Sequence, residues 1–119
     1  MEINVWMDHW QMECCGVPFH TGSEVQWQLR PATGLEWLDV VLSPGVAATV
    51  GAVEDHHGGS PLRAATVVSI ATVHCRFDPQ PVRGSGAMAW VQTAERWTSD
   101  DGDQHFAGFL VRALLADGI

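Results

Sequence analysis

The chain has 119 residues, and 14 acidic residues against 6 arginines, with no lysine, give it a net charge of −8. The arginines are scattered along the sequence, so no basic patch can displace the counterions of a nucleic acid, and nucleic-acid binding is disfavoured. Hydrophobic residues make up 46% of the chain, yet no run approaches the ~18 apolar residues of a membrane span. We therefore expect one globular domain, residues 1–119, with neither a nucleic acid nor a membrane as partner.

The cysteines and the start of the chain bear on its location. Residues 1–6 contain neither the basic region nor the apolar stretch of a signal peptide. Three cysteines cannot all pair within one chain, and a disulfide between the neighbours Cys14 and Cys15 would strain its ring. Reduced cysteines are typical of the cytosol, so we expect a cytoplasmic protein.

Apolar patterns and chain breakers predict the elements of the first half. Residues 3–12 are rich in Ile, Val and Trp and predict a strand, whereas two glycines and a proline make residues 14–22 a loop. Residues 24–30 alternate between apolar and polar side chains, which predicts a half-buried strand. Thr33 and Glu36 have the spacing of a capping box, so one short helix is expected near residues 34–42.

The second half is predicted to consist of strands. They are expected at residues 46–54, 63–77, 87–97 and 105–115, with an acidic turn at 99–103. About six strands and one short helix indicate a mainly β fold, a small antiparallel barrel or sandwich.

The longest predicted strand, residues 63–77, has an apolar face, and its cysteine is expected to pack in the core. Simple alternation places on that face Val67, Ser69, Ala71, Val73, Cys75 and Phe77.

Two doublets stand out as a candidate site, Cys14-Cys15 and His56-His57. Thiolates and imidazoles are the ligands that zinc prefers, and two pairs on separate segments would supply four of them. Neighbouring side chains of a strand point to opposite faces, so each doublet needs a turn, which the adjacent glycines permit. The alternative interpretation is that the cysteines are small buried hydrophobes and the histidines are solvated loop residues.

Two further interpretations stay open. A Cys14 or Cys15 thiolate near an imidazole would suit a cysteine-dependent enzyme or redox protein. Tryptophans left exposed would mark a ligand groove or a surface for a homodimer, although most of the six are expected in the core. These tryptophans are Trp6, Trp10, Trp27, Trp37, Trp90 and Trp97.

The chain resembles a family of small uncharacterised proteins, a domain of unknown function of high-GC Gram-positive bacteria. The resemblance rests on four segments over about two thirds of the chain: Trp10-Gln-Met-Glu-Cys-Cys-Gly16, Gly22-x-x-Val25-x-Trp27, Glu54-x-His56-His57-Gly58 and Val68-x-Ile70-x-x-Val73-x-Cys75. Such a family implies no activity, but it places both doublets in one set of motifs. We expect a non-enzymatic binding module with a structural zinc at Cys14, Cys15, His56 and His57. The alternatives are a small cysteine-dependent enzyme and an interaction protein that self-associates.

Overall fold

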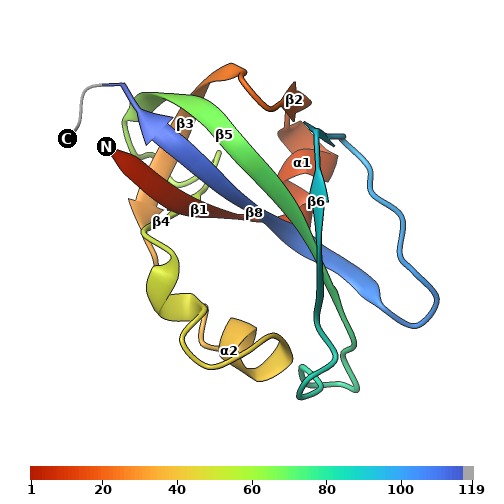
Figure 1. Cartoon of the computed structure of the whole chain (residues 1–119). Helices are drawn as coiled ribbons and strands as arrows, with labels where there is room; N and C mark the ends of the chain where they lie inside the picture. Colours follow the sequence, from red (N-terminus) through yellow and green to blue (C-terminus); the bar gives the residue numbers. More distant parts are fainter. Residues whose placement is uncertain (117–119) are drawn as a thin grey trace.

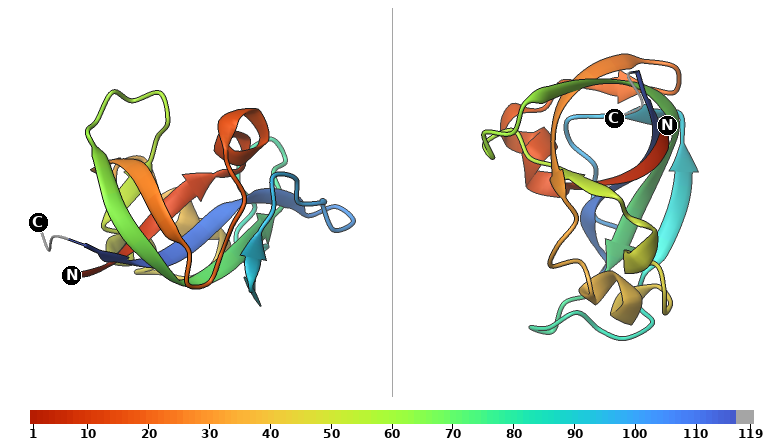
Figure 2. Two further views of the ribbon diagram at one scale, coloured as in Figure 1. Left: turned by 90° about the horizontal axis from the view of Figure 1, so that it is seen from above. Right: turned by 90° about the vertical axis from the view of Figure 1, so that its left-hand side faces the viewer.

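The computed structural model describes residues 1–116 and shows a mainly β protein built around a closed barrel (Figure 1). Five strands close the barrel in the order β3-β4-β1-β8-β5, because β5 also pairs with β3. Their bounds are β1 Glu2–Asp8, β3 Glu24–Pro31, β4 Ala52–Glu54, β5 Leu62–Cys75 and β8 His105–Leu115. All neighbouring barrel strands are antiparallel except β1 and β4, which pair in parallel. The right-hand view in Figure 2 shows the strands as a ring.

The remaining short strands and helices lie outside the five barrel strands. Strand β6 (Ala87–Val91) extends the sheet along β5, and β2 (Phe19–His20) pairs with β7 (Thr93–Ala94). The helices of the described chain are α1 (His9–Cys15), α2 (Trp37–Val41) and the 3₁₀ turn η1 (Ala47–Thr49). The mainly β class, with a small barrel, is therefore confirmed. No helix within residues 1–116 has the length and apolar character to cross a membrane.

The first predicted strand is too long, because helix α1 begins where β1 should continue. Strand β1 ends at Asp8, whose carboxylate accepts a hydrogen bond from the Trp6 indole at 2.7 Å, and α1 begins at His9. Seven residues make barely two helical turns, so the 3.6-residue period has no room to show in the sequence. Cys14 and Cys15 consequently lie in the last turn of a helix and not in a loop.

The second helix forms as predicted but is shorter and lacks the predicted cap. Its N-cap residue is Glu36, and no side chain caps the helix. The Thr33 hydroxyl instead accepts a hydrogen bond from Arg30 at 3.4 Å. The strand expected at residues 46–54 is also shortened, because η1 takes its first part and only β4 remains.

A β-bulge explains the error in the predicted face of β5. The pairing of β5 with β8 shifts between Val67 and Ser69, so the alternation reverses there. Ile70 therefore joins Val67 in the core inside the barrel, whereas Ser69 does not. Val73 and Cys75 belong to a second core cluster that also contains side chains of α2. Cys75 is fully buried, as predicted.

The tryptophans divide into buried and exposed groups. Trp6 and Trp27 are 0% and 5% exposed and lie in the two cores, as expected. Trp10, Trp90 and Trp97 are 44%, 72% and 67% exposed, so half of the tryptophans lie outside the core, where most were expected inside it. Trp90 lies on β6, at the edge of the sheet.

Candidate metal centre

The end of helix α1 presents Cys14 and Cys15 at the surface. The helix ends because Gly16 takes an extended conformation, while its N–H still donates to the Met12 carbonyl at 3.2 Å. A side chain at Gly16 would collide with Met12, since a Cβ there would lie 2.6 Å from the Met12 Cα. Glycine therefore lets the chain leave the helix next to Met12, and both cysteines remain exposed.

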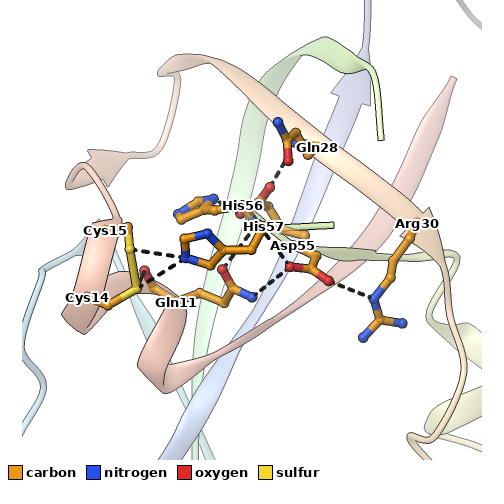
Figure 3. Close-up of polar contacts among 9 residues, drawn as sticks. Gln11, Cys14, Cys15, Gln28, Arg30, Asp55, His56 and His57 are labelled. Carbon is orange, nitrogen blue, oxygen red and sulfur yellow. Dashed lines mark hydrogen bonds and ion pairs between the residues drawn. A yellow bond between two sulfur atoms is a disulfide. The ribbon is translucent and has the colours of Figure 1, made fainter. Parts of the chain in front are cut away.

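The two cysteine sulfurs are bonded to each other in a vicinal disulfide (Figure 3). The expectation that these neighbours would stay unpaired is therefore wrong. That expectation rested on ring strain between neighbouring cysteines. In helix α1, consecutive side chains diverge by only about 100° around the helix axis. Both sulfurs can therefore lie on one side of α1. Of the three cysteines, Cys75 is free and buried, and burial raises the pKa of its thiol.

His57 reaches the cysteine pair from the loop that follows β4. Its Nε2 lies 3.4 Å from the Cys15 sulfur and 3.8 Å from the Cys14 sulfur. The three candidate ligand atoms lie within 4.8 Å of one another, and all three residues are exposed. The two doublets thus lie side by side although about 40 residues separate them, and Cys14, Cys15 and His57 form a group that could hold a metal ion.

The turn that carries His57 is organised by Asp55. The Gly58 N–H donates to the Asp55 carbonyl at 3.2 Å, and the His57 N–H donates to the Asp55 carboxylate at 3.1 Å. This local bonding is typical of aspartate in turns. His56 and His57 occupy the two central positions of the turn, so their side chains leave it in different directions.

Gln11 of α1 connects the helix to this turn. Its side-chain nitrogen donates to the Asp55 carboxylate at 3.3 Å, and its side-chain oxygen accepts from the His56 N–H at 3.1 Å. Gln11 is only 2% exposed, so these bonds are made away from water. They fix the distance between the cysteines and His57.

Strand β3 supports the same turn from the other side. The Arg30 guanidinium donates to the Asp55 carboxylate at 3.4 Å, and the Gln28 carbonyl accepts from the Asp55 N–H at 2.9 Å. The Gln28 side-chain amide faces the carbonyls of Asp55 and His56. In the orientation that satisfies these neighbours, with oxygen and nitrogen exchanged relative to Figure 3, its nitrogen donates to both carbonyls. Burial opposes ionisation of Asp55, but donors from His57, Gln11 and Arg30 outweigh it and lower the pKa of this carboxyl.

His56 has a different environment from its neighbour. Its Nδ1 contacts a carboxylate oxygen of Glu54, which is fully buried and whose other oxygen accepts from the Gln28 N–H at 2.9 Å. Burial raises the pKa of Glu54 to about 7 and lowers the pKa of His56, the latter helped by the nearby His57. Three of the four predicted ligands therefore meet, while the imidazole of His56 contacts Glu54.

Several residues that surround the site were not predicted to belong to it. The Trp10 ring stacks on the His57 ring, with an interplanar angle of 5° and centroids 6.3 Å apart. The Arg96 side chain donates to the Cys14 carbonyl at 3.3 Å. Asp55 carries a local signal in the sequence, as an aspartate that opens a turn. Trp10 and Gln11 lie on α1 with the cysteines, but the histidine loop that they contact is far away in the sequence, and Arg96 comes from another distant segment.

One of three comparisons with known proteins gave a match. A family model described as a family of unknown function, DUF6578, matches residues 1–114, so the chain belongs to this family. The resemblance to an uncharacterised family is thereby confirmed, and the match extends over nearly the whole chain. No curated protein and no solved structure matches the chain.

Proposed function

Because family membership carries no activity, we propose a function from the geometry: the protein is a binding module that holds a zinc-class metal ion with Cys14, Cys15 and His57. The observation that carries this proposal is the approach of two sulfurs and one imidazole nitrogen to within 4.8 Å of one another. Cysteine sulfur and histidine nitrogen are the donors that zinc prefers, at about 2.3 Å and 2.0–2.1 Å. Small side-chain movements suffice to bring these atoms to such distances from one ion.

The metal-binding form is the reduced one. A dithiol reductant first gives the disulfide two electrons and two protons and is itself oxidised to a disulfide, which leaves two thiols on the protein. A zinc ion then binds their thiolates with loss of those two protons. Two thiolates neutralise the charge of a divalent ion. The net charge of −8 adds a favourable field for a cation.

Such an ion would join two parts of the molecule. The cysteines belong to α1 and His57 to the loop between β4 and β5, so a bound ion would strengthen the connection that Gln11 already makes. An ion that binds the folded chain more tightly than the unfolded chain raises the stability of the fold. The fourth ligand position faces the surface, where a water molecule or a partner can occupy it.

Zinc titration of the protein in both redox states tests this proposal. Protein reduced without oxygen and freed of reductant is titrated with zinc in competition with a chromophoric chelator, beside the disulfide form. We expect one zinc per reduced chain and no comparable binding by the disulfide form. Equal zinc uptake by both forms, or none by the reduced form, would contradict the proposal.

Alkylation separates metal binding from use of a cysteine as a nucleophile. We expect zinc to protect Cys14 and Cys15 of the reduced protein from iodoacetamide, with peptide mass spectrometry as the measurement. Buried Cys75 serves as an internal control, because it should react only after unfolding. Fast modification of a single surface cysteine despite saturating zinc would favour the cysteine-dependent enzyme instead.

A further inference from the structure

A cavity of about 790 Å³ lies between the end of β1, the helices α1 and α2, and the start of β8. The segment that follows β5 bounds its remaining side. Ligand sites commonly have volumes of about 300–1,000 Å³. Cys14, Cys15 and His57 are not among the described residues that line it, so a ligand in this cavity would bind independently of the metal centre.

Two aromatic side chains form an accessible wall of the cavity. Trp37, at the start of α2, is half-buried, and Phe77, which follows β5, is 41% exposed. Their ring centroids are 6.1 Å apart and their planes are tilted by 50°, so the two rings do not cover each other face to face. Buried Trp6 contacts Trp37 edge to face from the core side and fixes its ring. The face of an aromatic ring carries negative potential and attracts a cation.

The charged side chains that line the cavity are carboxylates. Asp8 and Glu13 are half-buried and Asp100 is exposed, and no arginine is among the described residues of the lining. His9 and His105 also line the cavity, but imidazoles are ordinarily neutral at pH 8. Together with the net charge of −8, these carboxylates favour a cation over an anion.

Hydrogen bonds already made by the carboxylates narrow the kind of cation. The Asp8 carboxylate accepts from the Trp6 indole at 2.7 Å. One oxygen of Asp100 accepts from the Phe106 N–H at 2.9 Å, and the other accepts from Nδ1 of His105 at 3.2 Å. These two bonds lower the pKa of the Asp100 carboxyl. The cavity therefore offers negative charge, while most of these oxygens already have a donor.

A quaternary ammonium group fits this combination better than a primary one. A primary ammonium group has three N–H donors that each need an acceptor, whereas a quaternary group has none and presents methyl groups to its surroundings. Aromatic side chains recognise quaternary ammonium groups by cation–π attraction. We propose that this cavity binds a small quaternary ammonium cation, with its methyl groups against the rings of Trp37 and Phe77 and its charge facing the Asp8 carboxylate.

Choline and its uncharged isostere 3,3-dimethyl-1-butanol test this inference. Each compound is added to metal-free protein with the disulfide intact, at about pH 8 and at constant ionic strength set with sodium chloride. The shifts of amide and indole signals in nuclear magnetic resonance spectra measure binding. We expect saturable one-to-one binding of choline, at least about tenfold tighter than binding of the alcohol, because only choline carries the charge that the rings and carboxylates attract.

Two variants and a matched control locate the bound cation. Phe77→Leu keeps an apolar side chain but removes the ring, so it should weaken choline binding about fivefold and alcohol binding less than about twofold. Asp8→Asn removes one charge and should also weaken choline binding about fivefold. Glu2→Gln removes the same charge at the opposite end of β1, outside the cavity, and should leave choline binding unchanged.

The dispersion of the same spectra shows whether each variant is folded. The inference is overturned if the wild-type protein shows no saturable choline binding or binds the alcohol as tightly as choline. It is equally overturned if Asp8→Asn and Glu2→Gln have the same choline affinity, or if Phe77→Leu weakens the binding of both compounds to the same extent.

Discussion

The two doublets that meet at the candidate metal centre are held in different ways. Cys14 and Cys15 act as a pair, because the last turn of α1 puts both sulfurs on one side. His56 and His57 are separated by their turn, so that one imidazole reaches the cysteines and the other contacts buried Glu54. Adjacent residues of one type thus share a role only where the backbone between them brings their side chains together.

The largest effect should come from removing one member of the cysteine pair. We expect Cys14→Ala to weaken zinc binding by the reduced protein at least about 100-fold, since loss of a direct ligand should exceed the ~10–100-fold effect of an outer-shell partner. Cys75→Ala is the matched control and should retain zinc binding, because Cys75 is buried away from the site. Isothermal titration calorimetry gives both affinities. An equal loss of zinc affinity in the two variants would contradict the role of Cys14 as a ligand.

The connection between the doublets depends on Gln11. Replacement Gln11→Leu keeps the size of this buried side chain but leaves the His56 N–H without its acceptor and Asp55 without one donor. We expect the free energy of unfolding to fall by about 2–3 kcal/mol, as for buried polar groups that lose their partners. Urea denaturation of the metal-free protein measures this change. A loss below about 0.5 kcal/mol would show that Gln11 does not hold α1 to the turn.

The environment of His56 should be visible in the pH dependence of stability. The folded-state pKa of Glu54, about 7, lies above its ordinary value of 4.5, so between these values the folded chain keeps a proton that the unfolded chain has released. This contribution to stability is complete below pH 4.5 and is lost as the pH rises through about 7. Glu54→Gln removes it.

We therefore expect the free energy of unfolding of the wild type, relative to that of Glu54→Gln, to fall by about 3 kcal/mol between about pH 4 and about pH 8. Urea denaturation at about pH 4 and about pH 8 measures the difference between the two proteins. A constant difference, or one that grows with pH, would show that Glu54 is not held protonated by burial.

The smallest effect concerns the ring that covers His57. Trp10 stacks on His57 but is 44% exposed, so Trp10→Ala should change zinc affinity less than about tenfold and stability by about 1 kcal/mol. Trp90→Ala is the matched control, because Trp90 is 72% exposed on β6 and lies outside the site. If the two variants have the same zinc affinity, the Trp10 ring shields His57 from solvent but does not orient it for metal binding.

The sequence predicts the strands well where one pattern runs through a whole element. Residues 105–115 form β8 as predicted, and β3 differs from its prediction by one residue. Errors occur where a local event interrupts the pattern, as at the bulge after Val67 and at the junction of β1 with α1. Neither event has a marker such as proline or glycine beside it.

The candidate site was predictable as a set of residue types but not as a geometry. Sulfur and imidazole chemistry identified Cys14, Cys15 and His57, and the structure brings these three together. The different orientation of His56 depends on Glu54 being buried by the barrel, which no local pattern shows. The role of Gln11 is equally non-local, because its partners lie 44 and 45 positions away.

Cobalt spectroscopy of two histidine variants tests the central claim most directly. Reduced wild-type protein, His57→Ala and His56→Ala are each loaded with Co²⁺, and the thiolate-to-cobalt and d–d absorption bands are compared. We predict that His56→Ala keeps the wild-type cobalt spectrum and a cobalt affinity within about threefold of the wild type. His57→Ala loses a direct ligand, so it should show altered d–d bands and bind cobalt at least about 100-fold more weakly than the wild type. The reverse pattern, or identical spectra from both variants, would contradict a metal centre formed by Cys14, Cys15 and His57.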